Sequence, residues 1–365
     1  MLNLFCTFLR VFKQSQPTHA DMDPDAARVA MLYQDPHPAH RGFAEAIGAD
    51  LVDYHRIPAG PLADTIAEDV LNGLQYPNYD VYLIEGSRPL YAALTRRFTR
   101  GGTLIYLCAD HGFHELGNTD FEGDSGFKSL IGKFGRPAVR AVSRRGIDGV
   151  VAVSEFAAEF TRPIVGSDTP ITIAHPYIQP ETYTALNGVT PDLSANIAVT
   201  VGRAWRYKGV DLLVDAWSTV REEFPKAELH VVGNGHPEAY DEAPGVYRRG
   251  YVEELADAFE PASVFVQPSR VDTFPVSTLE AMRAGLVPLV TETTGTRSEA
   301  SQVDSSLVVP ADVQSLAEGV RNYFRHSLDD REEMSKAARH QAERFDPESR
   351  KAAFRDAFND ALKAL

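Results

Sequence analysis

The sequence is poor in cysteine and in basic charge. Cys6 and Cys108 are the only cysteines among 365 residues. Two cysteines so far apart form neither a disulfide framework nor a zinc site, and Cys108 closes an apolar run typical of a buried strand. The 36 Lys and Arg are outnumbered by 51 Asp and Glu, which gives a formal net charge of −15. Because a phosphate backbone attracts basic surfaces, this charge excludes nucleic acid as the partner.

Long apolar runs are also lacking, since none reaches the ~20 residues that a membrane span needs. One helical face of residues 1–13 is apolar: Leu2, Phe5, Leu9 and Phe12. This segment has neither the basic start nor the small-residue cleavage site of a signal peptide. Two interpretations stay open, a helix on a membrane surface or an extension packed loosely or on its own domain. We expect a cytoplasmic protein, and the first interpretation adds peripheral membrane contact.

Hydrophobic residues make up 44% of the chain, enough for two domains with full cores. Short apolar runs alternate with helical segments, and we expect strands at 28–33, 50–55, 80–86, 103–112, 149–154 and 170–176. Such alternation predicts parallel sheets covered by helices on both faces. Residues 177–194 lack this periodicity and are the candidate linker, after which the alternation restarts.

We therefore predict an α/β fold of two Rossmann-like, doubly wound domains that face a central cleft. The predicted boundaries are an N-terminal extension at 1–24, a first domain at 25–190 and a second domain at 191–345. The last predicted helix covers 346–365.

Two cations flank a strand–loop–helix junction in VGRAWRYKGVDLL, residues 201–213. Arg203 follows the predicted strand, and Lys208 comes just before the predicted helix. Cations beside a helix N-terminus at the carboxyl edge of a parallel sheet favour a diphosphate, although two solvated loop side chains remain the alternative. Gly233 and Gly235 in GNG indicate a tight exit from a strand, and the chain has no Walker sequence.

Two carboxylates, Asp272 and Glu280, lie around the start of a predicted helix in RVDTFPVSTLEAMRAG, residues 270–285. Residues 273–278 fall before or in its first turn, so their backbone N–H groups are available to sugar hydroxyls or phosphate oxygens. Paired carboxylates can accept hydrogen bonds from a polyol. The alternatives are a turn role for Asp272 and a helix-dipole role for Glu280.

Taken together, residues 196–325 resemble the retaining glycosyltransferases of family 4, which have the GT-B fold. GVVAVSEFAAEF at 149–160 and AHPYIQPETY at 174–183 resemble, more loosely, the family's first domain and its crossing to the second. The resemblance implies retaining transfer of a sugar from a nucleotide-diphosphate sugar to an acceptor hydroxyl of a glycan, glycolipid or lipid-linked saccharide. It also implies that the last helix folds back on the first domain.

Carried over residue by residue, the resemblance implies that Arg203 and Lys208 bind the donor pyrophosphate and Glu280 binds the ribose hydroxyls. Asp272 stands near the transferred sugar, where the family usually has Glu. This shorter side chain indicates a different donor sugar or lost activity. The loop that would present backbone groups to the donor consists of Phe274, Pro275, Val276 and Ser277.

The first domain is expected to supply the acceptor side. The family often has a His at a strand end near the reacting sugar, and His111 in CADHGFHEL is the best match, with His114 and Asp110 as rivals. Gly42, in HPAHRGF, is expected in the family's glycine-bearing first loop beside the donor.

No cofactor is expected, and the reaction is expected to need no metal. The DxD spacing in DMDPD at 21–25 lies ahead of the first strand and is interpreted as solvated acid. Two alternative functions stay open. One is a nucleotide-sugar epimerase or a sugar phosphorylase-like enzyme, and the other is a non-catalytic relative that serves as a partner subunit.

Overall fold

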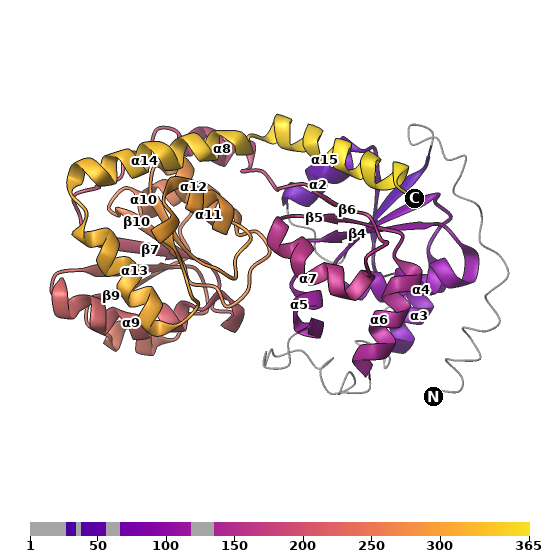
Figure 1. Cartoon of the computed structure of the whole chain (residues 1–365), viewed down its shortest axis with the longest axis horizontal. Coiled ribbons are helices and arrows are strands. Elements are labelled where there is room, and N and C mark those ends of the chain that lie inside the picture. Colours follow the sequence, from indigo (N-terminus) through magenta and orange to yellow (C-terminus); the bar gives the residue numbers. More distant parts are fainter. Residues whose placement is uncertain (1–26, 34–37, 56–65, 118–134) are drawn as a thin grey trace. The chain divides into compact units, whose positions relative to one another are not determined.

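The computed structural model describes residues 27–33, 38–55, 66–117 and 135–365. The chain forms two compact units, one of residues up to Ala174 together with Lys351–Leu365, and the other of His175–Arg350. Figure 1 shows the chain coloured along its sequence. The predicted extension at 1–24 and the acidic motif at 21–25 lie outside the described residues. The predicted domain boundaries at 190/191 and 345/346 lie near these divisions and remain predictions.

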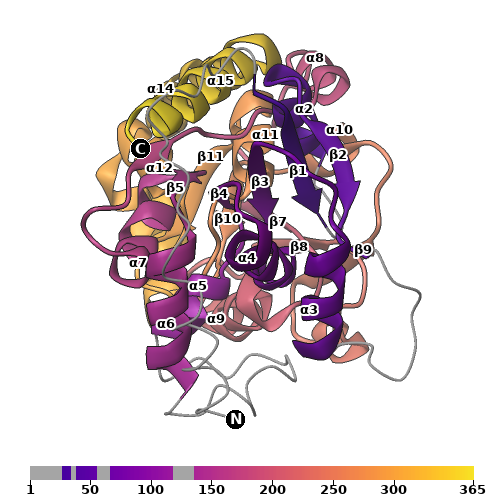
Figure 2. The ribbon, with the colours of Figure 1, turned by 90° about the vertical axis from the view of Figure 1, so that its right-hand side faces the viewer.

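The first unit contains a parallel six-stranded sheet in the order β2-β1-β3-β4-β5-β6 (Figure 2). Its strands are β1 (Val29–Tyr33), β2 (Asp50–Asp53), β3 (Val81–Glu85), β4 (Thr103–Cys108), β5 (Gly149–Ala152) and β6 (Ile171–Ile173). Every residue of β4 is buried, as expected of a strand covered on both faces.

Helices connect these strands: α2 (Pro38–Ala46), α3 (Ile66–Gln75), α4 (Ser87–Arg100), α5 (Gly112–Gly117), α6 (Gly135–Gly146) and α7 (Glu155–Val165). Ser154 caps α7, because its side chain accepts a hydrogen bond from Ala157 N at 3.0 Å. Helices α3 and α4 pack so closely at Gly73 that an added Cβ would lie 2.1 Å from Ala92 O.

The last helix, α15 (Pro347–Lys363), ends in the first unit. Phe354 stacks on Phe43 of α2 with ring centroids 4.1 Å apart, and both rings are fully buried. Thr172 of β6 donates its hydroxyl to Ala357 O at 2.9 Å. The C-terminal residues are therefore part of the core of the first unit.

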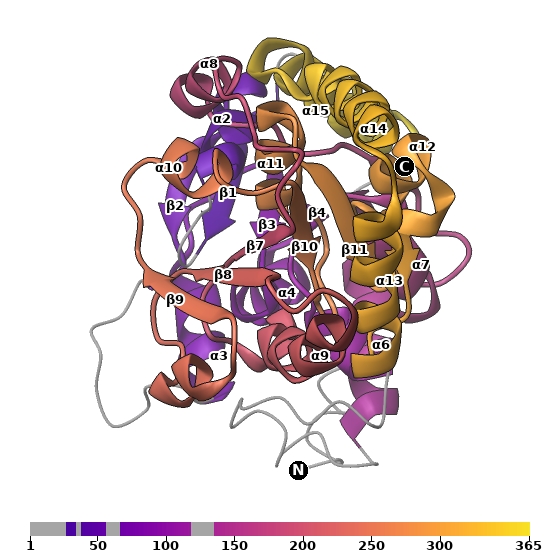
Figure 3. The same ribbon diagram turned by 90° about the vertical axis from the view of Figure 1, so that its left-hand side faces the viewer.

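The second unit contains another parallel six-stranded sheet, in the order β12-β11-β10-β7-β8-β9 (Figure 3). Its strands are β7 (Ile197–Val201), β8 (Glu228–Val232), β9 (Val246–Gly250), β10 (Val264–Gln267), β11 (Val287–Thr291) and β12 (Val308–Val309). Val264 and Val266 of β10 belong to one hydrophobic cluster and Phe265 to another, so both faces of the sheet are buried.

The helices of the second unit are α8 (Pro180–Leu186), α9 (Val210–Glu223), α10 (Leu255–Phe259), α11 (Val276–Ala284), α12 (Arg297–Val303), α13 (Val313–Arg325) and α14 (Leu328–Ala342). Helices α9 and α13 lie side by side (Figure 3). Helix α8 falls within residues 177–194, where the sequence showed no periodicity. Pro180 at the first position of α8 favours the helix start, because proline there costs no hydrogen bond and fixes a helical φ.

The strand order of the second sheet reverses between β7 and β10. These two central strands are neighbours, but the chain runs outward from β7 through β8 to β9 before it returns. In open parallel sheets, ligands bind beyond the carboxyl ends of the strands at such a reversal. The loops after Val201 and Gln267 therefore mark the place where a ligand is expected in this unit.

Candidate functional site

The loop after β7 carries both cations that are predicted to bind a diphosphate. Arg203 is exposed, and Lys208 ends a short 3-10 helix, Arg206–Lys208. Gly209 then starts α9 with φ 66°, and a Cβ there would lie 2.0 Å from Pro268 O. Only glycine adopts this positive φ without strain and also leaves room for Pro268 O. The loops that follow β7 and β10 can therefore touch at Gly209.

The loop after β8 lies against the loop after β7. Gly233 has φ 129°, and a Cβ there would lie 1.9 Å from Gly202 O. His236 Nε2 also lies 2.9 Å from Gly202 O, and Ala204 N donates to Asn234 O at 3.2 Å. The glycine pair in GNG is thus a close backbone contact between two strand exits.

The loop after β10 fixes the backbone of Asp272 from both sides. Asp272 N donates to Thr293 O at 3.0 Å, and Gly295 N donates to Asp272 O at 2.8 Å. Asp272 and Thr294 form an isolated parallel bridge. The backbone of Asp272 is therefore held by the neighbouring loop after β11.

Lys208 and Asp272 form an ion pair, although they are 64 residues apart in the sequence. Lys208 Nζ lies 2.7 Å from Asp272 Oδ2, and the two side chains are 18% and 10% exposed. The cation expected to bind a diphosphate is therefore already paired with the carboxylate expected near the transferred sugar.

Arg203 and two aromatic residues line the same loop. The Arg203 guanidinium lies over the Trp205 ring, 5.3 Å from its centroid, and Trp205 stacks with Tyr207 at 5.5 Å. Trp205 is 49% exposed. Because such contacts restrict the rotamers of a long side chain, they hold Arg203 at the carboxyl edge of the sheet.

Helix α11 begins beyond the reversal point with Pro275 as its N-cap residue and no side-chain cap. The first N–H groups of the helix, at Val276 and Ser277, have no intrahelical acceptor, whereas Thr278 N donates to Pro275 O at 3.0 Å. Ser277 donates its hydroxyl to Gln267 Oε1 at 3.3 Å. The predicted loop residues 274–277 thus lie between the end of β10 and the first turn of α11, and their contact with a donor remains a prediction.

The Phe274 ring is a packing group in this arrangement. It is buried and stacks with His175, with centroids 5.0 Å apart, and it also contacts Phe345. The side chain anchors the loop within the second unit. Residue 274 can therefore contact a ligand only through its backbone.

Glu280 lies in the second turn of α11, and its side chain is only partly exposed. Burial raises the pKa of its carboxyl group to about 7. No hydrogen bond or ion pair to this carboxylate occurs among the residues that the structure describes. A partly buried carboxyl group without a protein partner is suited to accept hydrogen bonds from the hydroxyls of a ligand.

In the first unit, His111 lies between β4 and α5 and is partly exposed. The rival Asp110 accepts hydrogen bonds from the Tyr106 hydroxyl at 2.8 Å and from Gly112 N at 3.2 Å. His114 lies in α5 and contacts the rings of Phe156 and Phe160. Both histidines and Asp110 follow the carboxyl end of β4, where the sequence placed them.

Gly42 does not lie in a loop, which corrects the expectation from the sequence. It is buried within α2, which begins at Pro38 because proline at the first position favours a helix start. Its predicted role in donor binding remains a prediction.

Sequence reasoning missed the buried pair formed by His40 and Glu85. His40 Nδ1 is hydrogen-bonded to Glu85 Oε1, across the point where the order of the first sheet reverses between β1 and β3. The two residues are 45 positions apart. The only signal in the sequence was a carboxylate at the end of the apolar run at 80–86.

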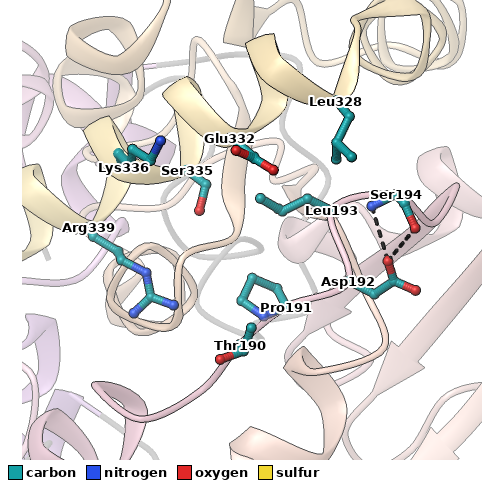
Figure 4. A pocket seen from close by; sticks show the side chains of 10 residues that line it. All are labelled: Thr190, Pro191, Asp192, Leu193, Ser194, Leu328, Glu332, Ser335, Lys336 and Arg339. Atoms are coloured by element: carbon teal, nitrogen blue, oxygen red, sulfur yellow. Dashed lines mark hydrogen bonds between the residues drawn. The ribbon is translucent and has the colours of Figure 1, made fainter.

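A hollow of about 500 Å³ lies elsewhere in the second unit (Figure 4). Its lining consists of Thr190, Pro191, Asp192, Leu193, Ser194, Leu328, Glu332, Ser335, Lys336 and Arg339. Residues 190–194 lead into the start of β7, so the hollow lies toward the amino edge of the sheet. Arg339 donates to the carbonyls of Val189, Arg283 and Ala284, which makes it a structural group.

Within the described ranges, no cluster of three or more His, Cys, Asp or Glu side chains is arranged to hold a metal ion. In the same part of the chain, no helix combines the length and apolar character needed to cross a membrane.

Comparison with known proteins identifies the second unit. Residues 195–326 match the family model described as glycosyl transferases group 1. The chain is similar to sulfoquinovosyl transferase SQD2 of Arabidopsis thaliana, at 29% identity over 161 residues, which are 41% of this chain and 30% of that protein. It is also similar to D-inositol 3-phosphate glycosyltransferase of Streptomyces bingchenggensis, at 24% identity over 62% of this chain and 57% of that protein. The matched segments span from 25% to 57% of the length of the curated relatives.

Solved structures resemble almost the whole chain. HepE of Anabaena in complex with UDP and glucose has a TM-score of 0.64 at 16% identity and covers 93% of this chain and 100% of its own. Sucrose-phosphate synthase of Thermosynechococcus elongatus has a TM-score of 0.70 at 17% identity and covers 94% and 97%. At such identities the likeness concerns the fold. The chain therefore has the α/β GT-B fold, and its residues 195–326 are a domain of the glycosyl transferases group 1 family.

Proposed function

We propose that this protein is a retaining glycosyltransferase that moves a sugar from a nucleotide-diphosphate sugar to an acceptor hydroxyl. One observation carries the proposal. At the reversal point of a group 1 domain, Arg203 and Lys208 follow β7, and α11, which carries Glu280, follows the neighbouring strand β10. Cations and a helix N-terminus suit a diphosphate, and a carboxylate beside them suits a ribose.

The chemistry follows from stabilising the leaving group. Arg203, Lys208 and the N–H groups at the start of α11 offset the negative charge that grows on the diphosphate as the anomeric carbon–oxygen bond breaks. The Asp272 carboxylate lies beside Lys208 and is suited to face the anomeric carbon, where positive charge develops. Because the protein supplies this compensation, the proposal includes no metal and no other cofactor.

On the acceptor side, we assign His111 to the reacting sugar and Gly42 to the donor. Support for His111 comes from its place beyond the end of β4 and its partial exposure. The acceptor belongs to the class of glycans, glycolipids or lipid-linked saccharides, and membrane contact, if used, is peripheral. UDP is the first nucleotide to test, since the similar HepE structure holds UDP.

A screen of nucleotide sugars tests the proposal. The protein is incubated with UDP-, GDP- and ADP-sugars, and release of the nucleoside diphosphate is measured with and without sugar acceptors. Release from one donor, with the anomeric configuration retained in the product, supports the proposal. An inverted product refutes retention, and interconversion of the donor sugar without release favours an epimerase.

A further inference from the structure

We propose that Asp272 makes the site discriminate between the sugar donor and the released nucleoside diphosphate. Its carboxylate neutralises Lys208, which weakens binding of the more highly charged product. The inference rests on the proposed function of the second unit and adds a specificity role for one residue.

The Lys208–Asp272 ion pair is buried enough to affect the free energy of ligand binding. Exposed ion pairs contribute ~0–1 kcal/mol, because water and salt screen them. Lys208 and Asp272 are only 18% and 10% exposed, and Nζ lies 2.7 Å from Oδ2. Removing one partner of such a pair leaves an uncompensated charge in a poorly solvated place. Each charge therefore sets how strongly the other attracts a ligand.

The pair is also fixed by the backbone on both sides. Asp272 is hydrogen-bonded to Thr293 and Gly295, and Lys208 is followed by Gly209, which has no room for a side chain against Pro268. Both ends of the ion pair therefore belong to the folded framework of the loops. A diphosphate that reaches Lys208 therefore lies close to the Asp272 carboxylate.

Charge then separates the donor from the product. When the anomeric carbon–oxygen bond breaks, the diphosphate keeps the bonding electron pair and gains one negative charge. The acceptor oxygen forms the new glycosidic bond and releases its proton to water, so the diphosphate retains the added charge. A phosphate oxygen bound to Lys208 lies within about 6 Å of the Asp272 carboxylate, so the extra charge is repelled at a distance where screening is incomplete.

The sugar of the donor compensates for this repulsion, whereas the product has no sugar to do so. Asp272 Oδ1 has no hydrogen-bond partner within the described part of the chain, while Oδ2 holds Lys208. A sugar hydroxyl can donate to Oδ1, and hydrogen bonds to charged acceptors are the stronger ones. Asp272 thus attracts the intact donor through its sugar and repels the bare diphosphate.

Asp272→Asn tests this directly, because it removes the charge and keeps the shape. In this variant the Lys208 ammonium has lost its carboxylate partner. An anionic ligand that binds there compensates the unpaired charge. We expect UDP, GDP or ADP, whichever the wild type binds, to bind about tenfold more tightly, in line with measured couplings of close charge pairs. The melting temperature without ligand should fall, and its rise on adding the nucleotide should exceed that of the wild type.

The experiment is titration calorimetry of the wild type and four variants with each nucleoside diphosphate and its glucose derivative. Asp272→Glu keeps the charge and should bind the nucleoside diphosphate as the wild type does. Lys208→Met should bind it more weakly. In the double variant Asp272→Asn/Lys208→Met, the gain seen in Asp272→Asn should disappear, because the gain requires Lys208.

The outcomes separate this inference from the proposed function. If Asp272→Asn binds the nucleoside diphosphate no more tightly than the wild type, while Lys208→Met binds it more weakly, the discrimination role is wrong and the donor site stands. If the gain persists without Lys208, the charge of Asp272 acts through another group and the inference is also wrong. If the wild type binds none of the three nucleotides, both the proposed function and the inference are wrong.

Discussion

The proposed site depends on a few charged side chains, and the simplest predictions concern them one at a time. Arg203→Ala and Lys208→Ala should each weaken donor binding, because each removes a charge-assisted hydrogen bond worth roughly 1.5–3 kcal/mol. The measurement is the dissociation constant of the donor for each variant. Arg206→Ala is the matched control, since Arg206 is an exposed cation in the same loop. Unchanged affinity in both test variants would place the diphosphate elsewhere.

Glu280 should make donor binding depend on pH. Its pKa of about 7 means that the carboxyl group loses its proton near neutrality, and only the charged form is a strong acceptor for ribose hydroxyls. Donor affinity should therefore rise between pH 6 and 8 in the wild type. Glu280→Gln should bind the donor more weakly at pH 8 and lose this pH dependence. Equal pH profiles for the two proteins would remove Glu280 from the ribose site.

The same shift predicts a stability effect in the ligand-free protein. Burial raises the folded-state pKa of Glu280 above its ordinary value of 4.5, so the folded protein binds this proton more tightly than the unfolded chain. The resulting stabilisation is fully present below about pH 4.5 and is lost as the pH rises through about 7. Glu280→Gln should thus gain stability relative to the wild type between pH 5 and pH 8. Urea unfolding at both pH values measures the difference, and a constant difference would contradict it.

At the scale of single elements, the start of α9 depends on one glycine. Gly209→Ala should lose stability both from a positive φ and from the overlap with Pro268 O. Gly250→Ala is the matched control, because its φ is also 66° and an added Cβ meets nothing within 4 Å. The strain costs about 1–2 kcal/mol in both, and the overlap should add about 1–3 kcal/mol in Gly209→Ala. Equal losses in urea unfolding would show that the loops do not depend on this close approach.

The elements were largely predictable from the sequence, whereas the contacts between loops were not. Apolar runs alternating with helical segments predicted two parallel sheets, because this signal is local. The Lys208–Asp272 pair joins residues 64 apart, and the His40–Glu85 pair joins residues 45 apart. Both pairs depend on strand order, which the sequence does not state. Helix α8 was missed because its segment shows no apolar periodicity, and Gly42 was placed in a loop because proline and glycine in HPAHRGF usually indicate one.

At the scale of the whole molecule, the C-terminal helix completes the core of the first unit. Phe354→Ala should destabilise that unit by about 3–5 kcal/mol, because it removes a buried ring stacked on Phe43. Arg355→Ala, at an exposed neighbouring position, is the control. Calorimetry should show earlier melting of the first unit only for Phe354→Ala. Equal melting of both variants would mean that α15 is not needed for this core.

The measurement that tests the central claim most directly is titration of the protein with UDP, GDP and ADP, alone and as sugar nucleotides. The proposed site predicts that one nucleoside diphosphate and its sugar derivative bind, and that Lys208→Ala and Arg203→Ala both weaken this binding. It also predicts that the bound sugar nucleotide is turned over when an acceptor is supplied. Absence of binding by all of these nucleotides, or binding that neither variant weakens, would contradict the assignment of a nucleotide-sugar site to the reversal point of the second sheet.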